Sequence, residues 1–333
     1  METKTLGFDY APAHFMFVAV HRDGQWNEGH IASYGPILVV PGAQVLHYGG
    51  GLIEGLKVQK THKTRTALFR PRENAHRMYL GAERMALAPV PGNLFMHGVE
   101  EVIRHNHDVI PDLGDGTMYL RPHLFGSGGV LGVKRAPECT FVVWANPVGP
   151  YFRGGFKPIS LMVSEDCSRV APGGLGDVKA AGNYSVGLIY AEYAKEHGFD
   201  ELLYLDSDQR HYYPEEAGTA NLFCAKDGVI YTPPLNGRIL PGVTRDSVIQ
   251  LARHLGYRVV EERFTLAFLL LHADEVWCTG TAAVLAEVGR IGYKGRTSLY
   301  APGTIAPRLR KALINLQTEA DEDPFEWVHP VAL

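Results

Sequence analysis

Cysteine is scarce in this sequence, with only four residues in a chain of 333. Cys139, Cys167, Cys224 and Cys278 are separated by 28, 57 and 54 residues. These spacings match neither the paired ligands of a zinc site nor the disulfide framework of a small secreted domain. The pattern predicts reduced thiols and a cytoplasmic location, because disulfides are rare in reducing compartments.

Long hydrophobic runs are also missing. The densest apolar stretches cover residues 15–20 and 266–271, far short of the ~20 residues that a membrane-spanning helix needs. The N-terminal segment lacks the basic region that precedes the apolar core of a secretory signal peptide. We therefore expect no membrane association.

Positive charge is not in excess. The chain has 32 Lys and Arg against 36 Asp and Glu, a net charge of -4 at pH 7. Because nucleic-acid binding needs clustered basic residues, we expect no nucleic-acid partner. The G-x-G-x-x-G, G-x-x-x-x-G-K-[ST], H-E-x-x-H and G-x-S-x-G signatures are absent too. His105 and His107 lie two residues apart in a helical pattern and face different sides, so we expect no metal site.

The sequence does contain alternating strand-like and helical segments, over a length that suits two domains. Strands are expected at 67–70, 140–147, 158–164, 201–206, 221–234 and 275–280, and helices at 71–87 and 244–256. Asp227-Gly228 predicts a hairpin turn inside one of these segments. The mixture favours an α+β fold with largely antiparallel strands in the second half. Prolines and glycines in 146–158 indicate a linker at 149–158 between domains 1–148 and 159–333.

Lys179 stands in an unusual setting, the segment GGLGDVKAAGNYS at 173–185. A lysine taken alone is most simply a surface residue. A lysine that forms a Schiff base, however, needs close access by a carbonyl carbon, and the small neighbours of Lys179 provide that space. Both interpretations remain open on these residues alone.

Three further segments carry candidate chemistry. Glu215 and Glu216 precede a small-residue turn and a strand; they are either a solvated loop or a carboxylate that faces a protonated ring nitrogen. Gly242 and Thr244 stand at the start of a predicted helix, where Thr244 is either a simple N-cap or part of an anion site. Residues 278–284, CTGTAAV, form a second small turn rich in hydroxyl groups.

In chain order, these segments resemble class IV, fold-type-IV pyridoxal-phosphate aminotransferases, and in particular the branched-chain amino-acid aminotransferases. The resemblance runs from about residue 45 to the C-terminus. It covers VLHYGGGLIEGLKV (45–58), LFRPRENAHRMY (68–79), MYLRPHLFGSGGVLGVK (118–134), NPVGPYF (146–152), GDVKAAGNY (176–184), EEAGTANLF (215–223), LPGVTRD (240–246) and TGTAAV (279–284). It implies a small α+β domain followed by a larger, mixed, barrel-like β domain with helices.

The resemblance also implies a role for each matching residue. Lys179 would form the Schiff base with pyridoxal 5'-phosphate and move the substrate proton, and Glu216 would pair with the pyridine nitrogen. The remaining cofactor-binding residues would be Arg77, Tyr184, Val243, Thr244 and Thr281. The substrate-binding residues would be Tyr48, Ile53, Tyr119, Arg121, Tyr151, Thr219 and Ala282, with no metal.

The sequence departs from the family pattern at two places. Ile53 stands in IEGLK where the family usually has an aromatic residue, so the substrate profile is open. Ala283 and Ala286 occupy the positions of a C-x-x-C redox pair that some relatives carry, so that switch is absent.

The implied reaction transfers the amino group between leucine, isoleucine or valine and 2-oxoglutarate by a ping-pong mechanism. Amino acids and 2-oxo acids would be its small-molecule partners, and the chain would assemble as a homodimer or higher homo-oligomer. A D-amino-acid or amine transaminase and an aminodeoxychorismate lyase are the alternatives within class IV. A catalytically silent pyridoxal-phosphate-binding protein is the alternative from another class.

Overall fold

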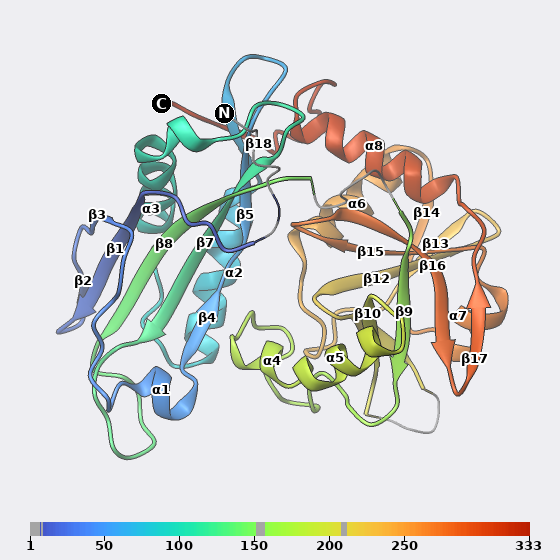
Figure 1. Cartoon of the computed structure of the whole chain (residues 1–333), viewed down its shortest axis with the longest axis horizontal. Helices are drawn as coiled ribbons and strands as arrows, with labels where there is room; N and C mark the ends of the chain where they lie inside the picture. The colour runs from blue at the N-terminus through green and yellow to red at the C-terminus, as the bar shows by residue number, and fades with distance from the viewer. Residues whose placement is uncertain (1–6, 8, 151–156, 208–211) are drawn as a thin grey trace. The chain divides into compact units, whose positions relative to one another are not determined.

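The computed structural model describes residues 7, 9–150, 157–207 and 212–333, and they form two compact units (Figure 1). Unit 1 combines the chain up to residue 153 with residues 178–182 and 315–333. Unit 2 comprises residues 154–177 and 183–314. The predicted domain boundaries stay a prediction. The segments 178–182 and 315–333, which belong to unit 1, lie inside the predicted second domain.

Unit 1 is built on one antiparallel sheet. Its path runs β18-β6-β5-β7-β8-β1-β2, with β3 paired to β1 and β4 paired to β7. The elements are β1 (Phe15–Arg22), β2 (Gln25–Trp26), β3 (His30–Ser33), α1 (Gln44–Tyr48), β4 (Gly51–Ile53), β5 (Leu56–Lys60), β6 (Thr66–Phe69), α2 (Pro71–Arg84), α3 (Gly92–His105), η1 (His107–Val109), β7 (Thr117–Gly126), β8 (Cys139–Val148) and β18 (Val328–Val331).

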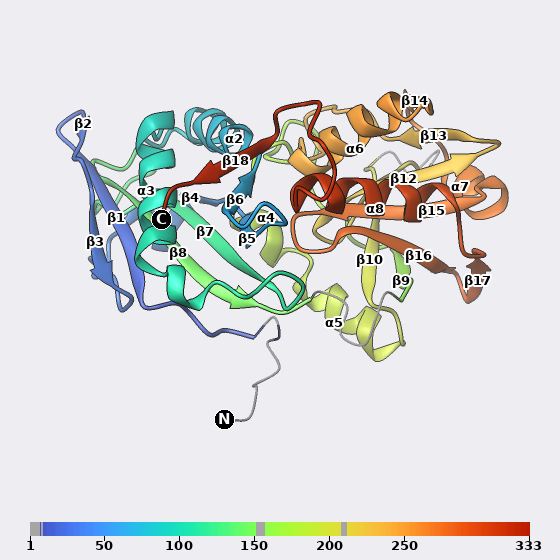
Figure 2. The same ribbon diagram turned by 90° about the horizontal axis from the view of Figure 1, so that it is seen from above.

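Helices α2 and α3 cover one face of this sheet (Figure 2). Pro71 begins α2, where its missing N–H costs nothing because the first turn has no intrahelical acceptor for it. Phe17 of β1, Phe95 of α3 and Phe141 of β8 are fully buried between the layers. Gly98 on α3 leaves room for the Phe17 ring, since a Cβ there would lie 2.6 Å from Phe17 Cδ1.

Unit 2 contains most of the remaining elements. They are β9 (Ile159–Ser164), α4 (Gly182–Ser185), α5 (Leu188–Glu196), β10 (Glu201–Leu205), β11 (Pro214–Ala217), β12 (Ala220–Lys226), β13 (Val229–Thr232), α6 (Val243–His254), β14 (Arg258–Glu261), α7 (Leu266–His272), β15 (Glu275–Gly280), β16 (Val284–Tyr293), β17 (Arg296–Leu299) and α8 (Ile305–Gln317). Helix α4 begins at the last residue of the 178–182 segment, and α8 continues into unit 1.

Six strands of unit 2 close into a barrel. The order β11-β10-β9-β16-β15-β12 returns to β11 through the β11–β12 pairing. The barrel is mixed. Strand β9 runs parallel to both β10 and β16, whereas the other strand pairs of the barrel are antiparallel. The predicted α+β fold with a mixed, barrel-like second part is confirmed.

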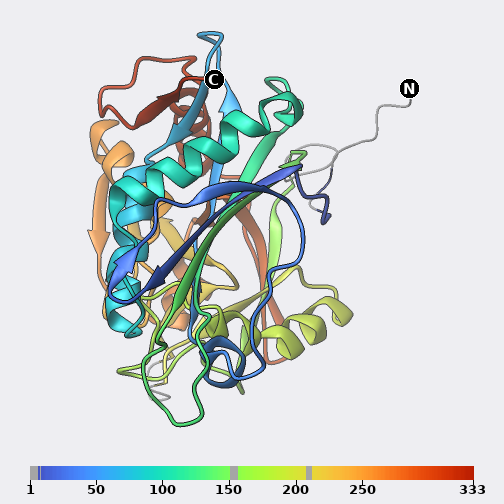
Figure 3. The ribbon, with the colours of Figure 1, turned by 90° about the vertical axis from the view of Figure 1, so that its left-hand side faces the viewer.

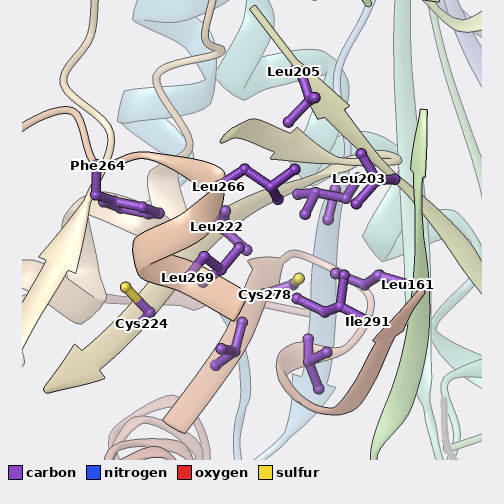
Figure 4. Close-up of a cluster of buried hydrophobic side chains, with 14 residues drawn as sticks. Leu161, Leu203, Leu205, Leu222, Cys224, Phe264, Leu266, Leu269, Cys278 and Ile291 are labelled. Carbon is purple, nitrogen blue, oxygen red and sulfur yellow. The ribbon is translucent and has the colours of Figure 1, made fainter. Parts of the chain in front are cut away.

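Alternating side chains fill the barrel (Figure 4). On β12, Leu222 and Cys224 belong to the interior cluster, whereas Phe223 between them stacks on Trp277 of β15 at 5.7 Å. All four side chains are fully buried, so both faces of this strand are covered. Leu266 and Leu269 extend the cluster from α7.

The locally encoded elements agree with the sequence patterns. Helix α6 ends at His254, two residues before Gly256, whose φ of +86° suits a helix stop. Asp227 and Gly228 both have positive φ and join β12 to β13, as expected for a tight hairpin. Among the described residues, no helix has the length and apolar character needed to cross a membrane.

Candidate active site

The Lys179 segment is attached to β4 within unit 1. The Ile53 N–H donates to the Lys179 carbonyl at 3.0 Å, and the Ala181 N–H donates to the Gly51 carbonyl at 3.0 Å. Leu52 and Ala180 form an isolated antiparallel bridge between these bonds. The backbone around the lysine is therefore fixed like a short additional strand.

This pairing determines which way the lysine points. Val178 and Ala180 are buried at 4% and 2% exposure, whereas Lys179 between them is only partly buried. Successive side chains of a strand alternate between faces. Lys179 thus lies opposite its two buried neighbours, away from the packed face of β4.

Helix α2 packs against the same segment through Gly81. A Cβ at Gly81 would lie 3.2 Å from Val178 Cγ1 and 3.7 Å from Leu52 Cδ2. The absent side chain allows the close approach of the helix. Arg77 lies one turn before Gly81, so the helix that carries the candidate phosphate ligand is held directly against the lysine segment.

Arg77 is engaged by a buried carboxylate, Glu54. Arg77 Nε lies 2.7 Å from Glu54 Oε1, and a terminal guanidinium nitrogen lies 2.8 Å from Oε2. Burial by itself raises the pKa of Glu54, but the charge and hydrogen bonds of Arg77, the charge of Lys179 and the Asn74 amide outweigh it. The pKa of Glu54 is therefore held below its ordinary value, and the carboxylate is ionised.

Three predicted substrate residues share one face of unit 1. Ile53 pairs with His123 across β4 and β7, and residues at every second position of β7 lie on the same face. Tyr119 and Arg121 of β7 therefore share the face of Ile53, and an Arg121 nitrogen lies 3.3 Å from the Tyr119 hydroxyl. The antiparallel pairing of β4 with the lysine segment places Lys179 on this face as well.

His123 is an additional member of this face that the sequence patterns did not indicate. Burial and the nearby Arg121 charge lower the pKa of His123 to about 4. The imidazole is thus uncharged at neutral pH, beside the arginine.

Tyr48 has different surroundings. It ends α1, and its hydroxyl donates to the Leu131 carbonyl at 2.5 Å. Figures 1 and 3 show α1 and the loop between β7 and β8 together at one end of unit 1. Tyr48 is 40% exposed and Leu131 is 87% exposed, so this end presents apolar surface. Tyr151, another predicted substrate residue, lies outside the described residues.

In unit 2, Glu215 and Glu216 both lie on β11 and are 4% exposed, so the solvated-loop interpretation is wrong. Glu215 Oε1 accepts from Arg238 Nε at 2.6 Å. Glu216 Oε1 accepts from the Asn221 amide at 2.9 Å, and Oε2 lies 2.5 Å from Arg169. Neighbouring residues of one strand thus serve two different ion pairs.

The spacing between Glu216 and Asn221 follows from a hairpin. The two residues are Cα partners in the β11–β12 ladder, and the intervening turn contains Gly218 with φ +54°. A cavity of about 190 Å³ adjoins this hairpin; its lining includes Tyr184, Glu216, Thr219, Asn183, Arg169 and Leu240. The structure therefore brings together three of the predicted residues and adds Arg169.

The start of α6 is packed against the same group. Gly242 is the N-cap and makes no side-chain capping bond, so the interpretation of Thr244 as a simple N-cap is wrong. A Cβ on Gly242 would lie 2.0 Å from Asn221 Oδ1. Val243 and Thr244 therefore begin their helix next to the amide that holds Glu216.

Thr281 and Ala282 lie in the turn between β15 and β16. Asn221 pairs with Thr279 in the β12–β15 ladder, two residues before Thr281. The register thus places this turn at the end of the barrel that carries Asn221 and the Glu216 hairpin. The predicted residues of unit 2 gather at one end of the barrel.

Comparison with known proteins agrees with this arrangement. Residues 51–291 match the protein family described as amino-transferase class IV. The chain belongs to the class IV aminotransferase family. The matched range covers both the arginine of α2 and the carboxylate of β11, so the family likeness includes both sets of residues.

Individual relatives of this aminotransferase extend the likeness over the whole chain. It is 43% identical to a chloroplastic branched-chain-amino-acid aminotransferase of Arabidopsis thaliana over 98% of this chain and 80% of the relative. The structure of a branched-chain aminotransferase from Thermoproteus uzoniensis with norvaline has a TM-score of 0.81, at 25% identity, over 95% of this chain and 100% of that one. The branched-chain amino acid aminotransferase of Escherichia coli has a TM-score of 0.79, at 28% identity, over 96% and 100%.

Proposed function

We propose that this chain is a pyridoxal-phosphate-dependent aminotransferase that moves the amino group of L-leucine, L-isoleucine or L-valine to 2-oxoglutarate. The observation that carries the proposal is that the four residue types that this chemistry needs are all present among the described residues. Unit 1 holds Lys179 and Arg77, and unit 2 holds Tyr184 and Glu216.

The residues present fit this cofactor chemically. Lys179 offers an amine on a fixed backbone, and Arg77 offers a guanidinium for a phosphate. The unit 2 cavity offers a buried carboxylate and a phenol hydroxyl in its wall. When bound, pyridoxal phosphate supplies an aldehyde that reacts with amines and a ring that accepts electron density from the substrate Cα.

Each side chain then has a defined task. Lys179 holds the cofactor and moves the proton from and to the substrate Cα. Glu216, which is kept in place by Asn221 and Arg169, holds a proton on the ring nitrogen. Arg77 and the N–H groups at the start of α6 bind the phosphate, together with Thr281. Tyr184 donates to the ring hydroxyl.

Substrate recognition involves the residues on the shared face of unit 1. Arg121 and the Tyr119 hydroxyl would bind the γ-carboxylate of 2-oxoglutarate by charge-assisted hydrogen bonds. Ile53 would contribute to the aliphatic wall. Thr219 and the N–H groups of Thr281 and Ala282 would receive the α-carboxylate. The reaction then has two half-reactions, of which the first releases a 2-oxo acid and the second consumes 2-oxoglutarate.

The exposed apolar end of unit 1 supports an assembly with a second copy of the chain. Leu38, Leu131 and Val133 are 95%, 87% and 86% exposed. Apolar side chains exposed to this extent are typical of protein interfaces. We propose a homodimer or larger homo-oligomer in which this end is covered, and sedimentation of the wild type and of Leu131→Glu tests it. A cytoplasmic location is part of the proposal, supported by four unpaired cysteines, and fractionation tests it.

The assay for the reaction combines the purified protein, pyridoxal phosphate, L-leucine and 2-oxoglutarate. We expect glutamate and 4-methyl-2-oxopentanoate in equal amounts. D-leucine and a primary amine serve as control donors and should give no product. If D-leucine gave product and L-leucine gave none, the result would contradict the proposed substrate class and favour a D-amino-acid transaminase.

A further inference from the structure

Glu54 is the most deeply buried carboxylate beside the candidate site, with no exposed surface. Its oxygens accept hydrogen bonds from Arg77, from the Asn74 amide at 2.8 Å and from the Gly55 N–H at 3.2 Å. Taking an ion pair out of water is expensive, and apolar residues of similar volume often replace such pairs without loss of stability. Stability alone therefore does not account for Glu54.

The segment around Glu54 connects several functional candidates. Ile53, the residue before Glu54, donates its backbone N–H to the Lys179 carbonyl. Gly55 immediately after it leaves room for Tyr119, since a Cβ there would lie 2.0 Å from the Tyr119 hydroxyl. Three consecutive residues, 53–55, thus contact the lysine segment, Arg77 and Tyr119.

The contact with Arg77 determines the orientation of its guanidinium. Glu54 binds the edge formed by Nε and one terminal nitrogen, in a two-bond, side-on geometry. Two parallel hydrogen bonds fix the plane of the group as well as its position. Asn74, on the same helix as Arg77, holds the Glu54 carboxylate from a third direction.

Resting on the proposed function, we propose that Glu54 is a positioning residue for the cofactor phosphate. It fixes the Arg77 guanidinium relative to the Lys179 backbone, so that phosphate and aldehyde are bound at a set separation. Glu54 itself does not touch the cofactor in this account.

Simple electrostatics predicts the opposite effect of removing Glu54. A carboxylate near a phosphate site repels the phosphate, so its neutralisation would strengthen binding if charge alone mattered. If positioning dominates, neutralisation weakens binding, because Arg77 loses its fixed plane. The direction of the change in affinity therefore distinguishes the two explanations.

The experiment measures the affinity of the Glu54→Gln apoenzyme for pyridoxal phosphate and for pyridoxal, which lacks the phosphate. We expect about tenfold weaker binding of pyridoxal phosphate, since hydrogen bonds to charged groups are involved, and unchanged binding of pyridoxal. In an Arg77→Ala background the same change should have no further effect. Glu73→Gln is the matched control, because Glu73 also lies on α2 and its carboxylate, which is 3.9 Å from Arg70, is exposed.

Unchanged or tighter binding of pyridoxal phosphate, or an equal loss for both compounds, would overturn the inference. Melting temperatures show whether each variant is folded. If Glu54→Gln does not fold, Asn74→Ala removes one donor to the carboxylate and should cause a smaller loss that is again specific to the phosphate. If Asn74→Ala bound pyridoxal phosphate as tightly as the wild type, the inference would be overturned. A wild-type protein that binds neither compound would instead contradict the proposed function itself.

Discussion

The two compact units hold buried carboxylates with matching sets of partners. Glu54 in unit 1 is held by an arginine, an asparagine and a backbone N–H, and so is Glu216 in unit 2. The proposed roles are reversed, however. In unit 1 the arginine faces the ligand and the carboxylate supports it, whereas in unit 2 the carboxylate faces the ligand and Arg169 supports it.

This comparison shows that a buried ion pair does not reveal by itself which partner is functional. The surroundings decide: Glu216 lines a cavity, whereas Glu54 has no exposed surface. Each supporting residue compensates the charge of its partner and fixes its geometry. The predictions below test this division of roles, from the largest expected effect to the smallest.

Replacement of the lysine should have the largest effect, because the proposal assigns two tasks to the Lys179 amine. Lys179→Ala should abolish amino transfer, since both the covalent attachment and the proton transfer are lost. Borohydride reduction of the wild-type holoenzyme and peptide mapping should locate the pyridoxyl group on Lys179. A label on another lysine would contradict the assignment.

The ligand-facing carboxylate of unit 2 should affect rate more than binding. Glu216→Gln should lower kcat by orders of magnitude while pyridoxal phosphate is retained, because the lost interaction is electronic. Glu215→Gln is the control one residue away, and its amide oxygen can still accept from Arg238. Steady-state kinetics of both variants check this. Equal kcat values would contradict the role assigned to Glu216, and a reversed order would show that Glu215 is the ligand-facing residue.

The ligand-facing arginine of unit 1 should show the complementary behaviour. Arg77→Lys should release pyridoxal phosphate readily on dialysis, because an ammonium group cannot reproduce two-bond contacts to Glu54 and phosphate together. With saturating cofactor, kcat should recover more than in Glu216→Gln. Full retention after dialysis would mean that the helix start at Val243 and Thr244 and the Thr281 turn bind the phosphate sufficiently alone.

His123 provides a pH test of the unit 1 face. Its folded-state pKa of about 4 lies below the ordinary value of 6.5, so the folded state disfavours the protonated form. Its contribution to stability is complete above about pH 6.5 and is lost as the pH falls through 4, in total about 3 kcal/mol. Denaturant unfolding of the wild type and of His123→Gln should show a smaller decline in the variant, and parallel curves would contradict the assigned pKa.

Ile53 should have the smallest effect. It shares the face of Tyr119 and Arg121, so Ile53→Phe should lower kcat/KM for bulky donors more than for valine, by about 1–3 kcal/mol in transition-state energy. The other possibility is that the ring only overpacks the site. A lower melting temperature with an unchanged ranking of donors would exclude Ile53 from the substrate wall.

Local patterns in the sequence were enough to predict α2, α6 and the Asp227-Gly228 hairpin. Helical periodicity, a first-turn proline and a positive-φ turn depend on neighbours in the chain alone. The family resemblance added Lys179 and Glu216 as candidate cofactor-binding residues.

The supporting residues could not be predicted in the same way. Glu54 reads as an ordinary charged residue after a strand, and only the packing of α2 onto β4 shows that it is buried. Arg169 lies outside any helix or strand, so no periodicity marks it. Gly81 looks like a helix defect until Val178, about a hundred residues later in the chain, is placed against it.

The measurement that tests the central proposal most directly is the absorbance spectrum of the pyridoxal-phosphate-loaded protein. Addition of L-leucine should convert the yellow form to a colourless one with release of the 2-oxo acid, and 2-oxoglutarate should then restore the yellow form. The same additions to Glu216→Gln should cause the change much more slowly. A yellow wild-type protein that L-leucine leaves unchanged would contradict the proposed aminotransferase activity.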